Sequence, residues 1–294
     1  MKPLLSISIP TYNREPFLDK ALENITAQLT PEVEIAISDD GSKDGTEAVA
    51  KKWQAKFPSQ IVYCKKPRNE RFDKNLVTAT EKSSGKYVWF MSDDDMLNPG
   101  AVARVLSEIK KKEAAGSQAF LLLNYSRYDN ATQSVTFERM MEFGDREFTP
   151  DQFMSLKAPK SYFDYLGMNI IYMSVFVFPR ELWLKHVECC KKFIGTNFIH
   201  CFVFIHILAE ERLSITYIGE PYVLYRSGNI RDWGTNVWKD FHTKFLNEVI
   251  SLGIAKGAAR KMKLRYGARK AVVSIGGKAK KTLRALRILP QKKQ

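Results

Sequence analysis

The sequence predicts an α/β protein with a mostly parallel β-sheet that is flanked by helices. Two observations lead to this fold class. Apolar strand-like runs alternate with helix-like segments through the first 112 residues, and a compact polar cluster follows directly after three of these runs. Because ligands bind at the carboxyl ends of parallel strands, the three polar clusters are candidate site residues.

The first four strands and their helices follow one another at short intervals. Pro16 and Pro99 suit the first turn of a helix, because that position needs no backbone N–H donor. Strands alternating with helices of this length are typical of parallel sheets. We expect strands over residues 4–9, 33–37, 61–64 and 87–91, and helices over residues 16–28, 45–56, 69–82 and 99–112.

Beyond residue 115 the order of elements is less regular. No internal repeat and no long linker occurs before residue 250. Apolar runs predict strands over residues 120–124, 134–138, 171–178, 215–218 and 222–225, and helices over residues 151–156, 180–191 and 198–210.

Composition and missing motifs exclude several classes of protein. Charged residues make up 27% and hydrophobic residues 45% of the 294, which is typical of a globular chain. The four cysteines show no paired spacing and no CxxC or HxxxH zinc pattern, so we expect a reduced, cytosolic chain. No apolar run reaches the ~18–20 residues that span a bilayer. Signatures of P-loop nucleotidases, dinucleotide oxidoreductases and serine hydrolases are also missing.

The strongest local signal is the triplet Asp93-Asp94-Asp95, which follows an apolar strand. Three carboxylates at a buried strand end repel one another, and a divalent cation would remove that cost. Carboxylate oxygens suit hard ions such as Mg²⁺ or Mn²⁺, which also bind substrate phosphates. The alternative is a solvated acidic turn that caps the helix behind it.

Three segments resemble, in order, the motifs of family 2 glycosyltransferases of the GT-A type. Residues 6–14 (SISIPTYNR) resemble the opening strand and its turn, residues 39–46 (DDGSKDGT) the DDGSxDGT motif, and residues 87–95 (YVWFMSDDD) the strand ending in a DXD metal motif. The resemblance covers about residues 4–112. It implies a Rossmann-like nucleotide-binding half and a transferase that uses a nucleotide-sugar donor to build bacterial surface polysaccharide, such as O-antigen lipopolysaccharide or capsule.

The resemblance also implies roles for individual residues. Asp39 is expected to face the base of the nucleotide, and Asp93 and Asp95 are expected to hold Mn²⁺ or Mg²⁺, with Asp95 as the direct ligand. Such an ion stabilises the charge that grows on the departing nucleoside diphosphate. The residues expected to bind the donor are Pro10, Thr11, Tyr12, Asn13, Asp39, Asp40, Arg71, Asn75, Asp93, Asp94 and Arg226.

The catalytic base is where the sequence departs from the family. Members are expected to invert, and they carry an acidic pair at the start of a helix in the second half, where this chain has His200. The segment "FIH" is similar to that of abequosyltransferase-like enzymes, and an imidazole can act as base. A core histidine is the alternative reading, with Asp164, Glu210 or Glu211 as other bases. For Arg226, a surface salt bridge is as plausible as contact with the diphosphate.

We expect three regions along the chain. Residues 1–112 form the nucleotide-sugar-binding half, residues 113–236 the acceptor-binding half of the same GT-A domain, and residues 237–294 a basic helical tail. All 32 acidic residues and only 32 of the 46 basic ones lie before residue 253, so residues 253–294 hold the whole net charge of +14.

The tail predicts a membrane partner. On a helical wheel, residues 279–289 place basic side chains on one arc and leucines on the opposite one, as in helices that lie on anionic membranes. No nucleic-acid-binding motif occurs, so no nucleic-acid partner is expected. We therefore expect a peripheral protein on the inner face of the cell membrane, with a saccharide acceptor linked to polyprenyl diphosphate.

Two other functions stay open at this point. A nucleotidyltransferase acting on sugar phosphates also uses acidic residues and a metal on an α/β sheet, although it normally has a Gly-rich basic loop after the first strand. A non-catalytic membrane-bound scaffold of the GT-A fold is suggested by the missing acidic pair. Release of a nucleoside diphosphate from a nucleotide sugar separates both from a glycosyltransferase.

Overall fold

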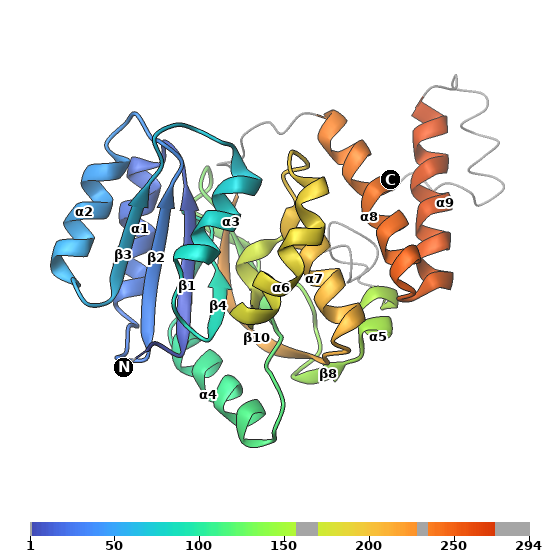
Figure 1. Cartoon of the computed structure of the whole chain (residues 1–294), viewed down its shortest axis with the longest axis horizontal. Coiled ribbons are helices and arrows are strands. Elements are labelled where there is room, and N and C mark those ends of the chain that lie inside the picture. Colours follow the sequence, from blue (N-terminus) through green and yellow to red (C-terminus); the bar gives the residue numbers. More distant parts are fainter. Residues whose placement is uncertain (1, 157–169, 228–234, 274–294) are drawn as a thin grey trace.

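The computed structural model describes residues 2–156, 170–227 and 235–273. Its central feature is a ten-stranded sheet that continues through both halves of the chain, with strands in the order β3-β2-β1-β4-β9-β6-β10-β5, while β7 and β8 pair at the side of this path. Helices α1 and α2 lie on one side of the sheet, and α3, α6 and α7 lie on the other (Figure 1). The predicted fold class, a mostly parallel sheet flanked by helices, is confirmed.

The first half forms the parallel part of the sheet. β2 and β4 both pair with β1 in parallel, and β3 extends the sheet beyond β2. The elements are β1 (Leu5–Thr11), α1 (Glu15–Thr26), β2 (Val33–Asp39), α2 (Thr46–Lys56), β3 (Ile61–Lys65), α3 (Phe72–Lys82), β4 (Tyr87–Phe90) and α4 (Ala101–Ala114). Every predicted element of this half is therefore present.

The second half joins the same sheet. β9 pairs antiparallel with both β4 and β6, and β10 pairs parallel with β6. The elements are β5 (Met96–Leu97), β6 (Leu121–Asp129), β7 (Ser134–Phe137), β8 (Arg146–Phe148), α5 (Pro150–Ser155), η2 (Met173–Val175), β9 (Phe176–Pro179), α6 (Arg180–Cys190), η3 (Lys191–Phe193), α7 (Ile199–Glu210) and β10 (Ile215–Ser227).

The structure differs from the sequence prediction at three places in this half. The two strands expected around Pro221 are one strand, β10, which passes Pro221 with a bulge rather than a turn. The strand expected over residues 171–178 begins only at Phe176, because residues 173–175 form the 3₁₀ helix η2. The very short strands β5 and β8 were missed, since both depend on pairing with β10 rather than on a local pattern.

Helix α7 lies in the centre of the second half. All its residues from Ile199 to Leu208 are buried, and a helix that is apolar on every side needs cover on every side. The ring of Phe204 packs against the rings of Phe90, Phe178 and Trp183 at centroid distances of 6.1, 5.0 and 5.8 Å. This aromatic cluster fixes α7 against α6 and the sheet.

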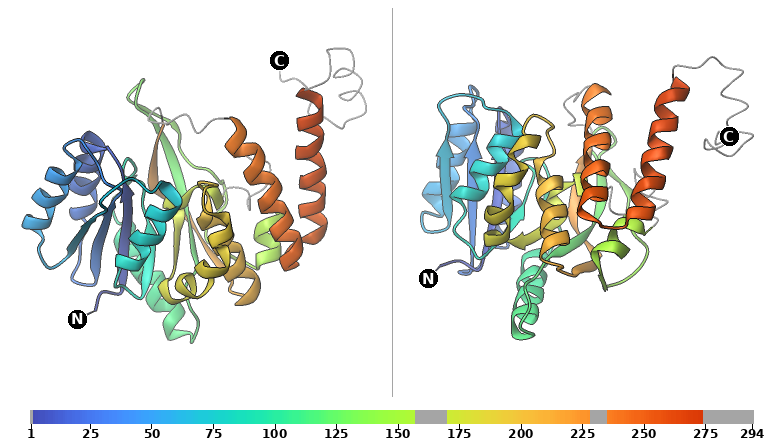
Figure 2. Two further views of the ribbon diagram at one scale, coloured as in Figure 1. Left: turned by 45° about the horizontal axis from the view of Figure 1, so that its top comes forward. Right: turned by 45° about the vertical axis from the view of Figure 1, so that its right-hand side comes forward.

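The beginning of the predicted tail belongs to the packed domain. Helices α8 (Thr235–Leu252) and α9 (Lys256–Val273) stand beside α7 and α5 (Figure 2). Phe241, Phe245 and Met262 are fully buried. The amphipathic helix predicted over residues 279–289 lies outside the described residues. Within the described part of the chain, no helix is long and apolar enough to cross a membrane.

Candidate active site

Three strand ends meet at one edge of the sheet. Thr11 at the end of β1 pairs with Asp39 at the end of β2, and the backbone N–H of Asp40 donates to the Thr11 carbonyl at 3.0 Å. On the other side of β1, the N–H of Met91, which follows β4, donates to the carbonyl of Ser8 at 3.0 Å. The three polar clusters of the sequence therefore lie next to one another.

The carboxylate of Asp39 is buried and holds the loop that follows β2. Its Oδ1 accepts hydrogen bonds from the backbone N–H and the hydroxyl of Ser42, at 2.8 and 2.5 Å, and its Oδ2 accepts one from the Tyr63 hydroxyl at 2.7 Å. Burial and the neighbouring Asp39 raise the pKa of Tyr63, so the phenol keeps its proton. Gly41 has φ of +77°, and a Cβ there would lie 2.9 Å from the Arg68 backbone, so the turn requires glycine.

The loops after β1 and β2 are bonded to each other. The N–H of Asn13 donates to the Ser42 hydroxyl at 2.9 Å, and the Asn13 side-chain carbonyl accepts from the N–H of Lys43 at 2.8 Å. Pro10 and Thr11 are buried and Tyr12 is half-buried, whereas Asn13 is exposed. The four residues predicted to bind the nucleotide thus lie together in and after the end of β1, where Asn13 bonds to the loop after β2.

Asp40 and Arg71 lie toward the loop between β3 and α3. The Asp40 carboxylate accepts from the backbone N–H of Glu70 at 3.1 Å, and the buried ammonium of Lys66 lies 3.3 Å from it. Arg71 is exposed and precedes α3 with φ of +75°. Neither side chain contacts the acidic triplet in the described contacts.

Asn75 ties two strands together. Its Nδ2 donates to the backbone carbonyls of Thr11 and Ser38 at 3.1 and 2.9 Å, and its Oδ1 accepts from the Ser38 hydroxyl at 2.7 Å. The side chain is buried, and both its donors are used by the strand ends. Asn75 therefore supports the ends of β1 and β2, and contact with a diphosphate stays a prediction.

The acidic triplet is buried and is bonded to Arg14. The Arg14 Nε lies 3.0 Å from Oδ1 of Asp93, and its Nη2 donates to Oδ2 of Asp94. The same guanidinium stacks on the Phe17 ring at 4.4 Å. Arg14 was part of a motif but was not predicted as a site residue. The signal that could have identified it is its charge, because buried carboxylates at a neighbouring strand end need a cation close by.

Asp95 joins the two halves of the domain. Its Oδ2 accepts hydrogen bonds from the hydroxyls of Ser174 and Tyr172, at 2.6 and 2.9 Å, and its Oδ1 accepts from the backbone N–H of Arg226 at 3.2 Å. The donors come from η2, the residue before it, and the end of β10. Their distance along the chain from Asp95 explains why sequence patterns did not indicate Tyr172 and Ser174.

The triplet holds more negative charge than its surroundings balance. Burial raises the pKa of Asp95 to about 7, and the Asp94 carboxylate acts in the same direction. Burial also raises the pKa of Asp93 to about 6, against the opposing effect of Arg14. Among the described residues, Arg14 is the one cation bonded to these carboxylates. A divalent cation fits this excess of charge and this set of oxygen donors.

Arg226 approaches the site from β10. Its Nε and Nη2 lie 3.2 and 3.1 Å from Oδ1 of Asn130, and its guanidinium lies 5.9 Å from the centre of the Phe17 ring. Its Nη1 is buried and has no hydrogen-bond partner in the part of the chain that the structure describes. The described contacts include no carboxylate on the Arg226 guanidinium, in contrast to the surface salt bridge considered above.

His200 lies behind the acidic site rather than in it. The side chain is 1% exposed, its Nε2 lies 3.0 Å from the carbonyl oxygen of Ile171, and burial lowers its pKa to about 4. Because Tyr172 follows Ile171 and bonds to Asp95, His200 supports the segment that holds the acidic site. The other proposed bases lie elsewhere: Glu210 and Glu211 at the far end of α7 bond to His206 and His186, and Asp164 is outside the described residues.

Asp73 is a structural residue of the second half that the sequence analysis missed. Its buried carboxylate accepts hydrogen bonds from the backbone N–H groups of Gly195, Asn197 and Ile199, at 2.7, 2.9 and 3.1 Å. It therefore caps the N-terminus of α7 from another helix, 126 residues away along the chain. No local signal could reveal this pairing, because the usual N-cap residue lies next to its own helix.

Comparisons with known proteins agree with this geometry. Residues 6–173 match the model of the family "Glycosyl transferase family 2". The chain is 25% identical to abequosyltransferase RfbV of Salmonella typhimurium, over 77% of this chain and 67% of that protein. It is 31% identical to the GalNAc(5)-diNAcBac-PP-undecaprenol beta-1,3-glucosyltransferase of Campylobacter jejuni, over 36% of this chain but only 34% of that protein.

Solved structures show the same fold. The crystal structure of S. aureus TarS 1–349 in complex with UDP superposes with a TM-score of 0.64, over 90% of this chain and 70% of that one, at 14% sequence identity. The mannosyltransferase PcManGT of Pyrobaculum calidifontis superposes with a TM-score of 0.55, over 97% of this chain and 79% of that one, at 16% identity. A family model that covers more than half of the sequence, on a fold that agrees with it, places this chain in glycosyl transferase family 2.

Proposed function

We propose that this glycosyltransferase is inverting and depends on a divalent cation, and that it transfers a sugar from a nucleotide-sugar donor to a saccharide acceptor. The single observation that carries the proposal is the position of Asp95. It lies at the strand ends beside the two nucleotide loops, yet its carboxylate is held by Tyr172, Ser174 and Arg226 from the other half. A donor on one side and an acceptor on the other would meet there.

The residues of the chain divide the chemistry as follows. Asp93 and Asp95 would hold Mn²⁺ or Mg²⁺, which as a Lewis acid stabilises the negative charge of the departing diphosphate. Arg226 keeps Nη1 for the same phosphates, and burial strengthens that interaction. Asp39 and Tyr63 form a fixed polar pair at the end of β2, in the place proposed for the nucleotide base.

The proton of the acceptor hydroxyl needs a base, and His200 has two candidate roles: this base, or a residue that positions its neighbours. A buried imidazole with pKa near 4 is a weak base at neutral pH, and efficient bases have pKa values near the working pH. The contact of Nε2 with the Ile171 carbonyl favours a positioning role. We propose that His200 keeps the segment from Ile171 to Ser174 in place, and the test below distinguishes the two roles.

The acceptor is proposed to be a lipid-linked saccharide at the inner face of the cell membrane. Two observations support this: the curated relative in Campylobacter jejuni carries an undecaprenol-linked acceptor in its name, and residues 253–294 hold the whole net charge of the chain. Anionic lipid attracts such basic segments by about 1 kcal/mol per residue near the surface. The donor sugar would then be added to a growing surface polysaccharide.

The experiment measures release of nucleoside diphosphate from a panel of nucleotide sugars, with Mn²⁺, with Mg²⁺ and with chelator. Membrane extract supplies the acceptor. We expect one donor to be used, activity to be lost in chelator, and Asp95→Asn to lose at least about 100-fold. Asp19→Asn removes an exposed carboxylate on α1 and should behave as wild type. Full activity in chelator, or of Asp95→Asn, would refute the metal site. With pyrophosphate added, formation of a nucleoside triphosphate and a sugar phosphate from the nucleotide sugar would indicate a nucleotidyltransferase.

A further inference from the structure

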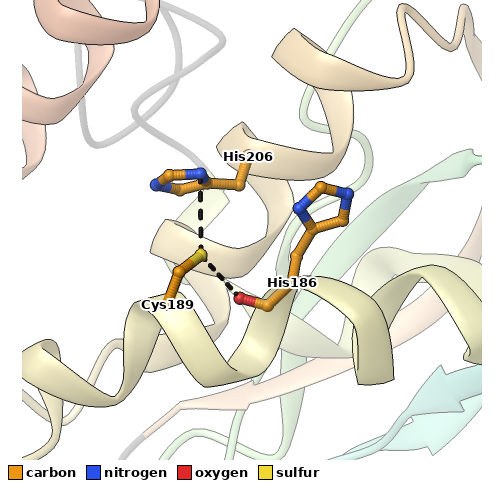
Figure 3. Close-up of side chains that lie close together, drawn as sticks. All are labelled: His186, Cys189 and His206. Carbon is orange, nitrogen blue, oxygen red and sulfur yellow. Dashed lines mark hydrogen bonds between the residues drawn. The ribbon is translucent and has the colours of Figure 1, made fainter.

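A second cluster of metal-ligating side chains lies between α6 and α7, away from the nucleotide site. His186 and Cys189 come from successive turns of α6, and His206 comes from α7 (Figure 3). One ring nitrogen of each histidine and the Cys189 sulfur lie within 4.8 Å of one another. Both histidines are buried, whereas the cysteine is exposed, so an ion could enter from solvent at the sulfur.

The ring nitrogens are oriented as in a zinc site. Nδ1 of His206 lies 3.9 Å from Sγ of Cys189 and 2.7 Å from Oε1 of Glu210, and Nδ1 of His186 lies 3.7 Å from Oε2 of the same glutamate. Both Nδ1 atoms, a thiol and a carboxylate therefore face one region. Tetrahedral zinc with its usual bond lengths separates sulfur and nitrogen ligands by about 3.6 Å, close to the observed 3.9 Å.

The other nitrogen of each ring is bonded as metal-bound histidines require. Nε2 of His186 lies 2.6 Å from Oε1 of Glu211, and Nε2 of His206 lies 3.0 Å from Oε1 of Glu248 on α8. A carboxylate on the outer nitrogen fixes the tautomer that leaves Nδ1 free to bind a metal, and it makes that nitrogen a stronger donor.

The charges of the cluster also favour a cation. Three glutamates meet the two imidazoles, and the neighbouring cations are Lys185, 2.7 Å from Glu211, and Lys192, 3.2 Å from Glu248. Among the described contacts, neither lysine forms a salt bridge with Glu210. Nδ1 of His206 faces it at 2.7 Å, so a proton or a metal ion must lie between the two acceptors.

We propose that His186, Cys189 and His206 bind one zinc ion, with Glu211 and Glu248 as the outer carboxylates and Glu210 beside the two Nδ1 atoms. Imidazole nitrogen together with a thiolate sulfur is a ligand combination typical of zinc. The ion would join α6 to α7 and, through Glu248, both to α8. Its role is structural: it fastens the helical layer behind the sheet, and it is independent of the nucleotide site.

The test uses the full chain, stripped of metals and then titrated with Zn²⁺ and with Co²⁺. We expect one zinc per chain, and a cobalt spectrum with tetrahedral bands and a thiolate-to-cobalt band, which an oxygen-only site at Asp93 and Asp95 cannot produce. Cys189→Ser should abolish that band and weaken zinc binding at least about 100-fold. Cys64→Ser removes a thiol on β3 and should change neither.

Two glutamine variants separate the loss of a metal ligand from the loss of the fold. Gln places its side-chain nitrogen where Nε2 stood, so His186→Gln and His206→Gln keep the outer carboxylate contacts but lose Nδ1. Both should fold, as judged by circular dichroism, and both should lose the rise in melting temperature that zinc gives the wild type. Three results would each overturn the proposal: less than about 0.1 zinc per chain, a cobalt spectrum without the thiolate band, or wild-type zinc affinity in Cys189→Ser. Loss of zinc from Cys64→Ser would also overturn it, because it would show non-specific binding to thiols.

Discussion

Removing the carboxylate of Asp73 tests whether α7 depends on a cap supplied by α3. In the structure this carboxylate accepts three backbone N–H groups at the start of α7, and two of them, from Gly195 and Asn197, belong to residues with positive φ. Asp73→Ala leaves the three donors without their acceptor. The loop would have to open to hydrate them, and the buried first turn of α7 would open with it.

The expected loss follows from the number of bonds. A hydrogen bond to a charged acceptor contributes about 1.5–3 kcal/mol, so three give an upper range of about 4.5–9 kcal/mol. Burying the carboxylate raises the pKa of Asp73, which shows that desolvation offsets part of that gain. We therefore expect Asp73→Ala to lower the free energy of unfolding by about 3–5 kcal/mol, a large share of the usual 5–15 kcal/mol.

Asp73→Asn gives a graded comparison. Its single carbonyl oxygen can accept the pair from Gly195 and Asn197, but its amino group then faces the N–H of Ile199. We expect a loss of about 2–3 kcal/mol. Glu188→Gln changes a carboxyl group that is 76% exposed on α6 and should stay within about 0.5 kcal/mol of wild type.

Urea unfolding followed by circular dichroism measures all three variants. Equal slopes with shifted midpoints would show that stability alone has changed. If Asp73→Ala unfolds within about 1 kcal/mol of wild type, or if Asn and Ala cost the same, the three hydrogen bonds do not hold α7 and the reasoning fails.

Three further predictions concern the site and the tail. Without metal, the pKa of Asp95 is raised from about 4 in the unfolded chain to about 7 in the folded one, so the stability that comes with its neutral form is lost as pH rises through about 7. In chelator, wild type should therefore lose up to roughly 4 kcal/mol of stability between pH 4 and pH 8. Urea midpoints at these two pH values should show that the isosteric Asp95→Asn loses less. If His200 positions the Ile171 carbonyl, His200→Gln should keep at least about a third of wild-type kcat with an unchanged pH–rate profile, while His200→Ala should lose about 10-fold or more. If His200 is the base, both variants should lose about 10²–10⁴-fold in kcat, and the fall of the rate at acidic pH should disappear. Truncation after Val273 removes 7 of the 14 basic residues of the tail and should keep the melting temperature and donor hydrolysis but weaken sedimentation with anionic vesicles. Truncation after Leu252 also removes buried Ala259 and Met262 and should destabilise the domain. Unchanged vesicle binding after truncation at Val273 would contradict the membrane role of the amphipathic segment.

Local sequence patterns were enough to predict the first half of the fold and the place of the site. Strand and helix periodicity depends on neighbouring residues, so eight of the nine elements up to α4 could be predicted within a few residues of their ends, and the two-residue strand β5 was missed. The polar clusters after β1, β2 and β4 also had to meet, because parallel strands end at one edge of the sheet. Glycosyltransferase membership followed from those same local motifs.

Tertiary structure alone decided what surrounds that site. Asp95 bonds to residues 77, 79 and 131 positions away, and Asp73 caps a helix 126 positions away. The sequence showed no zinc pattern because the spacing of known motifs is local, whereas His186 and His206 are brought together by two packed helices. His200 shows the same limit: its position in a motif predicts a base, whereas its burial and its contact with the Ile171 carbonyl are visible only in the folded chain. Local sequence patterns reflect which secondary structure a short segment prefers. The partner of a buried polar group can lie far away in the sequence, so it depends on how the whole chain folds.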